Sequence, residues 1–374
     1  MNEIQLGEII ELTKGKKHQV TDDETAFRYL QIEDLDGSAN FKFTSENGVL
    51  ASPDDIIIAW DGANAGKVGT GLSGMIGSTL ARMTIRKDIA YPRFIYWFLD
   101  SKFEFIKSKR TGATIPHISN SALRILSVPL PPLPEQQRIA TILDHADTIR
   151  RKNREILEKY NQLAQSVFLE MFGDPVSLKQ RVDKKKLKEL CTQITDGTHD
   201  TPARITTGNK FITGKHIKPF IIDYDNSDYV SEDDHNEIIK RCYPEKGDIL
   251  YTNIGVNLGT AAMNTVDYVF SMKNVALIKY NRDFIYGRYL ESLLNQPSFK
   301  LEILRLASLG GAQQFLSLKQ IRELEIPIPN YIVQKKYETL FEQIENQKTI
   351  ILKSSAKSEE LFQSLLQRAF RGEL

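Results

Sequence analysis

The sequence is poor in residues that build disulfide frameworks, metal centres and membrane spans. Its two cysteines, Cys191 and Cys242, lie far apart and form no CxxC pair, so we expect neither a disulfide framework nor a zinc site. The six histidines show no spacing typical of metal ligands. The N-terminal segment is acidic and polar, unlike a signal peptide, and the longest apolar runs are far shorter than a membrane span. We therefore expect a protein of a reducing cytoplasm, with no metal and no membrane partner.

The chain also lacks a strong net charge. Lys and Arg number 49 against 48 Asp and Glu, which leaves a formal net charge of +1. No strongly basic domain marks a nucleic-acid binder, so such a role needs a local basic face. The 374 residues suffice for two sizeable cores, and a hydrophobic share of 41% is ordinary for a soluble globular protein.

Signatures of catalysis are missing as well. The sequence contains no serine elbow, no cysteine–histidine signature and no Asn-Pro-Pro-Tyr-type methyltransferase motif. The run from Gly62 to Lys67 lacks the spacing of a phosphate-binding loop, because three residues separate Gly62 from Gly66 and Val68 follows the lysine. We interpret this run as tight surface turns between short strands, and we expect no catalytic residues.

The main feature of the chain is a repeat. A proline-rich segment, Val128-Pro129-Leu130-Pro131-Pro132-Leu133-Pro134-Glu135-Gln136-Gln137-Arg138, is matched by Ile326-Pro327-Ile328-Pro329-Asn330 followed by Val333-Gln334-Lys335-Lys336. Upstream, the segment 55–60 matches 248–252, and 112–115 matches 311–314. The offset of about 200 residues exceeds the roughly 20–50 residues of solenoid repeats. It equals a globular domain plus a long helix.

Each proline-rich segment leads into a long helical stretch. Pro134 suits the first turn of a helix, and Glu135 there meets the positive end of the helix dipole. Further along, residues in steps of three and four predict a coiled-coil seam that ends at Gly173. The seam residues are Ile139, Ile142, Ala146, Ile149, Asn153, Ile156, Tyr160, Leu163 and Val167. The second stretch, about 333–371, has a weaker seam of Tyr337, Leu340, Ile344, Ile351, Leu361 and Leu365.

These patterns predict a mixed α/β (α+β) protein with two similar globular domains separated by two long helices. We assign residues 1–128 and 176–329 to the domains, because Gly-rich turns there separate short β-type runs. The first proline-rich segment and its helix take residues 129–175, and the second helix takes 330–374. A helix of roughly 38 residues is about 57 Å long, too long for the inside of one small domain. We expect the helices to pack as an antiparallel coiled coil, relating the halves by a pseudo-twofold axis.

The segment 129–140, Pro-Leu-Pro-Pro-Leu-Pro-Glu-Gln-Gln-Arg-Ile-Ala followed by a seam helix, resembles the specificity subunit of type I restriction–modification systems. The duplicated plan of target recognition domain and helix resembles this family over essentially the whole chain. Asp196-Gly197-Thr198-His199 and the segment 310–317 are similar to motifs of such recognition domains. In the first domain, the segments 14–18 and 111–114 stand in their places.

This resemblance implies a non-catalytic subunit that recognises DNA. Each globular domain would read one half of a bipartite target in double-stranded DNA, and the helices would set the spacing. The helices would also dock two modification (methyltransferase) subunits, and restriction (translocase and endonuclease) subunits would join that core. S-adenosylmethionine, ATP and Mg would belong to those partners, and this chain would bind no cofactor. The resemblance places the protein in the prokaryotic cytoplasm, in phage defence.

Two alternatives stay open at this point. In the first, the twin domains bind protein or small ligands and the helices merely dimerise, so that the chain is a scaffold that does not bind DNA. In the second, the chain is the specificity subunit of a related phage-defence methylation system. Salt-dependent DNA binding would distinguish a DNA reader from the scaffold.

Candidate DNA contacts are the basic and short polar side chains of loops. Basic side chains suit phosphates, although a solvated charge run is the alternative. Amides and short polar groups suit base edges, whereas capping of turns is their alternative interpretation. The first-domain candidates are Lys14, Lys16, Lys17, His18, Asn64, Lys67, Lys109, Arg110 and Thr114. The second-domain candidates are Thr195, Asp196, Thr198, His199, Gln313 and Gln314.

Candidate assembly residues lie in the first proline-rich segment and on the helices. The proline-rich segment contributes Pro131, Pro132, Pro134, Gln136, Gln137 and Arg138. The first helix contributes Ile142, Ile149, Ile156 and Leu163, which we expect on a stripe that faces the second helix or a partner. The second helix contributes Leu340 and Ile344.

Overall fold

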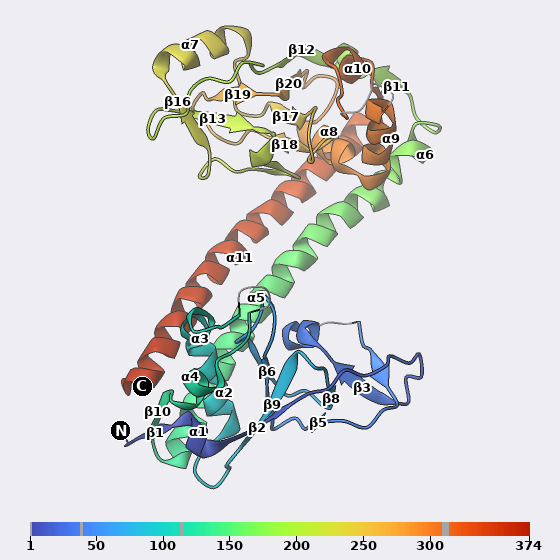
Figure 1. Ribbon diagram of the computed structural model, residues 1–374. Coiled ribbons are helices and arrows are strands. Elements are labelled where there is room, and N and C mark those ends of the chain that lie inside the picture. Colours follow the sequence, from blue (N-terminus) through green and yellow to red (C-terminus); the bar gives the residue numbers. More distant parts are fainter. Residues whose placement is uncertain (1, 38–39, 113–115, 309–313) are drawn as a thin grey trace. The chain divides into compact units, whose positions relative to one another are not determined.

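The computed structural model describes residues 2–37, 40–112, 116–308 and 314–374 (Figure 1). The chain divides into two compact units. Unit 1 comprises Met1–Glu155 and Leu352–Leu374, and unit 2 comprises Ile156–Ile351. The long helices α5 (Leu133–Phe172) and α11 (Tyr331–Arg371) therefore contribute to both units.

The strands described in unit 1 form two four-stranded sheets and one two-stranded ladder. They are β1 (Asn2–Gln5), β2 (Ile10–Lys14), β3 (Phe27–Leu30), β4 (Phe43–Thr44), β5 (Leu50–Ala51), β6 (Ile56–Ala59), β7 (Val68–Thr70), β8 (Gly74–Ile76), β9 (Leu80–Ile85) and β10 (Ser127–Leu130). The larger sheet is antiparallel in the order β2-β9-β6-β7, and β1 pairs with β10. The other sheet, β4-β3-β8-β5, contains the parallel pair β3 and β8. The β-branched isoleucines of β6 favour its extended backbone.

Helices cover the larger sheet of unit 1. They are α1 (Leu6–Ile9), the 3₁₀-helix η1 (Ile32–Asp36), α2 (Pro92–Ser101), α3 (Phe103–Ser108), α4 (Asn120–Arg124) and the first part of α5. Pro92 begins α2, where its missing N–H costs no helical hydrogen bond. Phe94 and Phe98 of α2 belong to the same core as Ile56 and Ile58 of β6.

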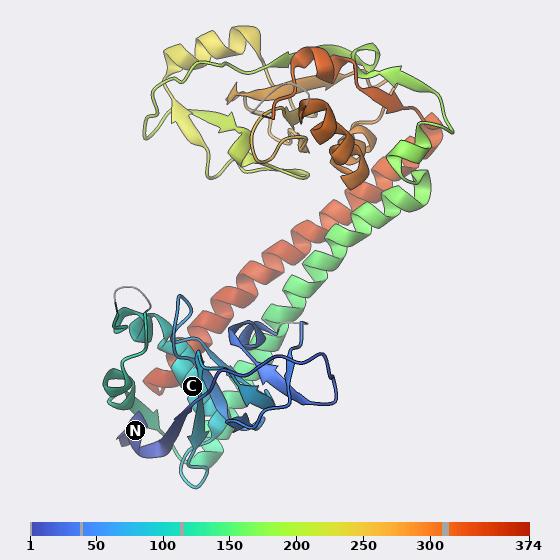
Figure 2. The ribbon, with the colours of Figure 1, turned by 45° about the vertical axis from the view of Figure 1, so that its right-hand side comes forward.

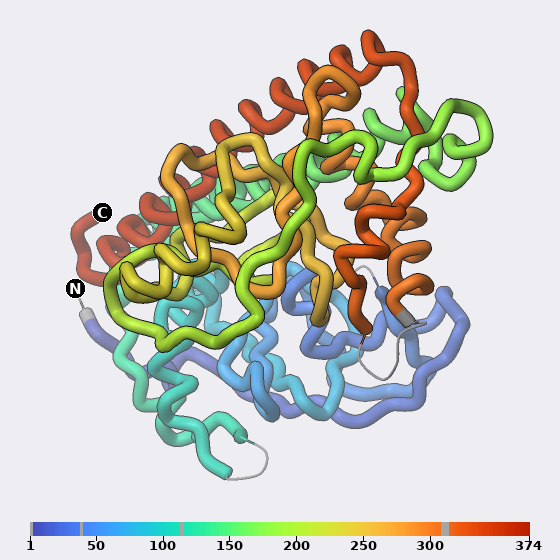
Figure 3. The backbone as a smooth tube through the Cα atoms, turned by 90° about the horizontal axis from the view of Figure 1, so that it is seen from above, coloured from blue at the N-terminus to red at the C-terminus, as the bar shows by residue number. Residues whose placement is uncertain are grey.

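The end of α11 completes the core of unit 1. Phe362, Leu366 and Ala369 are buried there, and the Phe362 ring lies 5.4 Å from Trp97 between centroids. Ile4 of β1 and Leu374 pack against the same core. Strand β1 and the C-terminal end of α11 accordingly lie close together in all three views (Figures 1, 2 and 3). Unit 1 therefore needs residues from both ends of the chain.

Unit 2 repeats the plan of unit 1. Its strands are β11 (Lys184–Lys186), β12 (Cys191–Asp196), β13 (Asn209–Thr213), β14 (Ile217–Lys218), β15 (Ile221–Ile222), β16 (Asp228–Val230), β17 (Ile249–Thr252), β18 (Ala261–Met263), β19 (Ser271–Lys273), β20 (Val275–Tyr280) and β21 (Glu325–Pro327). The antiparallel sheet β12-β20-β17-β18 matches β2-β9-β6-β7, and the parallel pair β13 and β19 matches β3 and β8. The ladder of β11 and β21 matches that of β1 and β10.

The helices of unit 2 include counterparts of those of unit 1. They are α6 (Pro175–Leu178), the 3₁₀-helices η2 (Leu187–Leu190) and η3 (Gly214–His216), α7 (Glu232–Arg241), α8 (Gly287–Asn295), α9 (Pro297–Ser308) and α10 (Leu318–Arg322). Helices α8, α9 and α10 match α2, α3 and α4. Phe172 near the end of α5 packs on Tyr289 of α8 and Tyr337 of α11, at centroid distances of 4.8 and 5.4 Å. The repeat confirms the prediction of two similar mixed α/β domains.

Helices α5 and α11 run antiparallel, as expected. Unit 1 contains the beginning of α5 and the end of α11, and unit 2 contains the remaining parts. In unit 1, Arg150 pairs with Glu359 at 3.1 Å and places its guanidinium 4.0 Å from the centroid of the Phe362 ring. Asn153 donates to the hydroxyl groups of Ser358 and Ser354 at 3.2 and 3.3 Å. Within this polar layer Asn153 and Ser358 are buried, whereas Ser354 is exposed.

The predicted seam of α5 is half wrong. Buried or half-buried residues follow the series Ile139, Leu143, Ala146, Arg150, Asn153, Leu157, Tyr160, Ala164 and Phe168. The expected positions Ile149, Ile156 and Leu163 are exposed by 53%, 37% and 43%, and Ile142 is only half-buried. Apolar residues stand side by side at 142 and 143 and again at 156 and 157. The spacing alone therefore could not decide which of the two residues faces α11.

The seam of α11 departs from the prediction in the same way. Tyr337 and Ile344 are buried as expected, and Phe341 is buried between them. Leu340 and Leu361 are exposed by 42% and 53%. Leu340 is thus accessible to a partner, whereas Ile344 lies in the core of unit 2 and is not.

Candidate nucleic-acid interface

Both units carry the same loop at one edge of the larger sheet. We call residues 60–67, between β6 and β7, the tip loop of unit 1, and residues 253–260, between β17 and β18, the tip loop of unit 2. Gly62 and Gly66 have φ of 91° and 100°, and Gly255 and Gly259 have φ of 88° and 78°. The N–H of the second glycine donates to the last residue of the preceding strand at 2.8 Å in unit 1 and 2.9 Å in unit 2. Positive φ at both positions requires glycine, so the two loops are matching structures.

The second motif of the resemblance lies beside the tip loops. Ile254 forms an antiparallel bridge with Phe315, and Asp61 forms the equivalent bridge with His117. The structure therefore brings His117 and Phe315 of these segments to the tip loops. Thr114 and Gln313 lie outside the described residues, and Gln314 is exposed.

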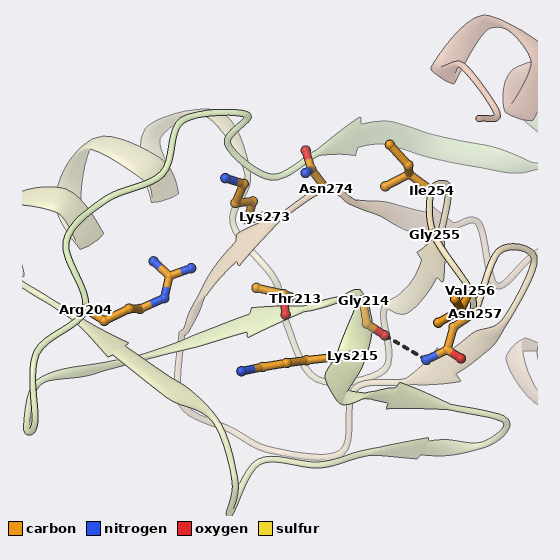
Figure 4. A pocket seen from close by; sticks show the side chains of 10 residues that line it. All are labelled: Arg204, Thr213, Gly214, Lys215, Ile254, Gly255, Val256, Asn257, Lys273 and Asn274. Atoms are coloured by element: carbon orange, nitrogen blue, oxygen red, sulfur yellow. Dashed lines mark hydrogen bonds between the residues drawn. The ribbon is translucent and has the colours of Figure 1, made fainter. Parts of the chain in front are cut away.

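A cationic hollow of about 350 Å³ lies beside the tip loop of unit 2 (Figure 4). The charged ends of Arg204, Lys215 and Lys273 gather at one end of the hollow, and residues 254–257 lie at the other. Asp228 pairs with Arg204 at 3.3 Å and with Lys215 at 3.0 Å, and Lys273 donates to Thr201. Two of the three cations share the Asp228 carboxylate and Lys273 has a neutral partner, so the hollow keeps the positive charge expected of an anion-binding surface.

The neighbouring cations change the pKa of Asp228. Burial acts to raise the pKa of Asp228, but hydrogen bonds and charges from Lys215 and Arg204 outweigh it and hold the pKa below its ordinary value. At neutral pH the carboxylate is therefore ionised and offsets part of the positive charge. Burial and the charge of Lys215 lower the pKa of His216. That histidine therefore adds no positive charge at neutral pH.

The first motif of the resemblance borders the same hollow. Thr198 forms a bridge with Lys273, and its hydroxyl accepts from the N–H of Asp200 at 3.1 Å. The exposed His199 ring binds Asp196 through Nε2 at 3.0 Å and Asn274 through Nδ1 at 3.0 Å. Thr195 is half-buried in β12. Of the residues predicted here, His199 is exposed and Thr198 is half-buried, and they contact Asn274 and Lys273 of the hollow.

Asp196 does not suit direct base contact. Its side chain is 5% exposed and pairs with Arg241 at 2.6 Å as well as with His199. Both carboxylate oxygens are therefore occupied by protein partners. The residue positions the loop, which corrects the expectation that it contacts DNA.

The basic residues predicted in unit 1 fall into two groups. Lys16 and Lys17 are exposed after β2, and Lys109 is exposed with its ammonium 5.7 Å from the ring centroid of Phe105. Other cations have protein partners: Lys14 pairs with Asp61 at 2.8 Å. The first group keeps the accessibility that a phosphate contact needs.

Arg110 and Lys67 hold the tip loop of unit 1. The Arg110 guanidinium donates to the carbonyl oxygen of Ala63 at 3.0 Å and also to that of Ala65. Lys67 pairs with Asp36. Asn64 at the tip is exposed, and among the described residues no side chain or backbone group binds its amide. Arg110 thus stabilises the loop, while Asn64 keeps its hydrogen-bonding groups for a ligand.

His18 was wrongly expected on the surface. It is 7% exposed, its ring packs edge-on against Tyr29 at 5.3 Å, and its Nδ1 lies 3.2 Å from Glu46. A Cβ at Gly48 would lie 2.4 Å from the ring, so the packing is tight. A ring enclosed in this way cannot reach a phosphate.

Two of the predicted assembly residues are internal. Gln136 is fully buried, and it binds the backbone of Tyr91, Ile89 and Pro131. Pro131 is buried as well. Both residues join α5 to the domain of unit 1, so partners cannot reach their side chains.

The remaining predicted assembly residues are accessible to different degrees. Pro132, Pro134, Gln137 and Arg138 are exposed. Arg138 pairs with Glu135 at 2.7 Å, and the hydrogen bond raises the pKa of the arginine and lowers that of the glutamate. On α5, Ile149, Ile156 and Leu163 recur every seven residues and are exposed. This exposed apolar stripe is the surface that the sequence assigned to α11 or a partner.

Sequence reasoning missed the cationic hollow. Arg204, Lys215 and Lys273 stand apart in the chain and form no basic run. Val256 was missed too, although the Gly-x-x-x-Gly spacing of Gly255 and Gly259 repeats that of Gly62 and Gly66. That shared spacing was the available signal.

Within residues 2–37, 40–112, 116–308 and 314–374, no three His, Cys, Asp or Glu side chains gather as metal ligands. In the same described part of the chain, no helix has the length and apolar character that crossing a membrane requires.

Known proteins resemble this chain in both sequence and fold. The sequence matches the family described as type I restriction modification DNA specificity domain over residues 1–159 and 180–361. It is 25% identical over 369 residues to the specificity subunit of the type I restriction enzyme MjaVIII of Methanocaldococcus jannaschii, with 92% of this chain and 85% of that protein covered. The EcoBI specificity subunit of Escherichia coli is 22% identical over 412 residues, with 99% and 85% covered.

Two solved structures resemble the fold. The S subunit of a type I restriction–modification system from M. genitalium superposes with a TM-score of 0.67 at 18% identity, covering 99% of this chain and 96% of that one. A chain from a study of complex assembly in the type I system gives 0.56 at 18% identity, covering 100% and 98%. At this identity the likeness concerns the fold.

Proposed function

The chain belongs to the type I restriction modification DNA specificity family, and we propose that each of its globular domains reads one half of a bipartite target in double-stranded DNA. As a specificity subunit it recognises DNA for a type I restriction–modification system. In each domain the reading surface is the tip loop with the segments beside it, and in unit 2 it includes the cationic hollow.

The repeat of the tip loop is the observation that carries this proposal. Two domains with the same loop, held by the same glycines, present two equivalent surfaces. Each surface combines exposed side chains at a loop tip with nearby cations, such as Lys14 beside Asp61 in unit 1 and Lys273 in unit 2. Cations position a protein on phosphates, and loop side chains contact base edges.

The partners follow from the same family membership. We propose that two methyltransferase subunits dock on α5 and α11 and that restriction subunits join that core. The exposed residues Ile149, Ile156 and Leu163 support this assignment, because a series of exposed apolar side chains on a helix favours a protein contact. Leu340 and the exposed part of the proline-rich segment, with Gln137 and Arg138, would extend the docking surface.

The chemistry is assigned to those partners. We propose that S-adenosylmethionine, ATP and Mg bind to the methyltransferase and restriction subunits, and that this chain is non-catalytic and binds no cofactor. The sequence supports this because it has no methyltransferase motif of the Asn-Pro-Pro-Tyr type. The complex would act in the prokaryotic cytoplasm, where its DNA is.

The test is DNA binding by the reconstituted methyltransferase complex at several salt concentrations. A DNA reader releases counterions from phosphates, so the logarithm of its binding constant falls linearly with the logarithm of salt concentration. We expect this fall and a preference for one bipartite sequence over random DNA. A protein-only scaffold would show neither the salt dependence nor the sequence preference.

A further inference from the structure

The two tip loops share a backbone but differ in the side chains at their tips. Unit 1 presents Ala63 and Asn64, and unit 2 presents Val256 and Asn257 at the same places after the first glycine. The Asn257 amide donates to the carbonyl oxygens of Gly214 at 3.1 Å and Ile217 at 3.3 Å. It is therefore used within unit 2, whereas the Asn64 amide has no protein partner in the described part of the chain.

Val256 is left as the outermost group of its loop. Its relative exposure is 102%, although single exposed apolar residues are common and need no explanation. Val256 differs from such single exposed residues because its loop fixes its position. Gly255 and Asn257 on either side are held by the turn and by the hydrogen bonds to Gly214 and Ile217, so the loop fixes the position of the side chain. A group fixed in full contact with water suits binding because little conformational entropy is lost.

The hollow that Val256 lines also contains three cations, which favour an anionic ligand. Figure 4 shows Val256 at one end, with Lys215, Lys273 and Arg204 toward the other end. Cations beside an exposed apolar tip complement a polyanion that presents apolar groups between its phosphates. Double-stranded DNA has this combination, because thymine carries a 5-methyl group in the major groove between the two phosphate backbones.

We propose that Val256 is a specificity-determining residue that reads a thymine through its 5-methyl group in the major groove. Arg204, Lys215 and Lys273 contact the neighbouring phosphates and set the depth of the loop. Valine has no hydrogen-bonding group, so it distinguishes bases only by apolar contact, and the thymine methyl is the apolar feature that this groove offers. This inference rests on the proposed function of unit 2 as a DNA reader.

The experiment removes the methyl group and nothing else. Methylated adenines in the source genome give the target, and short duplexes carry it with each thymine replaced in turn by deoxyuridine. Binding is measured with the complete complex of this chain and its methyltransferase subunits. At one thymine of one half-site, the replacement is expected to weaken binding about fourfold, the effect of one buried methyl group.

Variants of the chain then assign the contact to Val256. Val256→Ser should bind thymine and deoxyuridine duplexes equally at that position, and Val256→Ile should keep the preference for thymine. Ala63→Gly, in the matching loop of unit 1, should leave this preference unchanged. Because the Val256 side chain is fully exposed, its variants should share the thermal midpoint of the wild type.

The results that overturn the inference differ from those that overturn the proposed function. A wild-type complex that prefers the target but responds to deoxyuridine at no position would refute the thymine contact alone. Full retention of the preference in Val256→Ser would assign the methyl contact to another residue. A wild-type complex without salt-dependent DNA binding would refute the reading function itself.

Discussion

Gln136 accepts a hydrogen bond of 2.8 Å from the backbone N–H of Tyr91, and this contact recurs in unit 2 between Gln334 and Tyr286 at 3.1 Å. Both glutamines are fully buried. The amide of each also donates to the proline five residues earlier, at 2.8 Å in unit 1 and 2.9 Å in unit 2. In each unit, one buried glutamine at the start of the long helix thus links that helix to the proline-rich segment and to the domain.

Replacing Gln136 by leucine should destabilise unit 1. The change leaves the Tyr91 N–H without its partner, and an unsatisfied buried group costs about 1–3 kcal/mol. Both tryptophans of the chain, Trp60 and Trp97, lie in unit 1, so their fluorescence during urea unfolding reports on that unit. The exposed neighbour Gln137 is the control, and Gln137→Leu should change the free energy of unfolding by less than about 0.5 kcal/mol. Equal effects of both variants would contradict the assignment.

Leu143 and Ile149 should respond in opposite ways to substitution. Leu143 is fully buried against the core of unit 1, so Leu143→Ala should lower its free energy of unfolding by about 2–5 kcal/mol. Ile149 is 53% exposed, so Ile149→Asp should leave stability nearly unchanged.

Ile149→Asp should also weaken the binding of methyltransferase subunits, because Ile149 lies on the proposed docking surface. A polar group placed in an apolar contact costs about 1–3 kcal/mol, so binding of methyltransferase subunits should weaken about fivefold or more. Titration of labelled chain with those subunits measures the loss. Normal affinity with normal stability would remove Ile149 from the docking surface.

Lys273→Ala should weaken DNA binding without changing the preferred sequence. A single phosphate contact contributes about one unit to the slope of log binding constant against log salt concentration, so the slope should become shallower by about one. Lys246, which pairs with Asp267 at 3.0 Å away from the hollow, provides the matched control. If Lys246→Ala shifts the slope as much as Lys273→Ala, the effect is one of net charge and the hollow has no special role.

The sequence was sufficient to predict the repeat and the antiparallel helices. The repeated proline-rich segments and the long runs of spaced apolar residues are strong local signals. These signals could not predict the register of the seam, because Leu143 and Leu157 each follow an isoleucine that fits the spacing equally well. Arg150 also occupies a seam position by stacking over Phe362, and periodicity of apolar residues cannot detect that contact.

The candidate site was predictable only in outline. The motifs around Thr198 and Gln314 lie beside the hollow and the tip loop, and their contact with DNA stays a prediction. His18 and Asp196 carry the same chemistry in the sequence, but the fold buries both among fixed partners. The hollow itself depends on the pairing of distant strands, so one sequence gives no local sign of it.

The exchange of one domain tests the central claim, that the two units read separate half-sites. The exchange replaces residues 1–155 together with 352–374 by those of a relative, because Trp97, Leu143 and Phe362 share one core, which should come from one protein. The methylated adenines are then sequenced in a strain that carries only the hybrid chain. We expect one half of the methylated motif to change and the other half to stay as it was. A change in both halves, or in neither, would contradict the account.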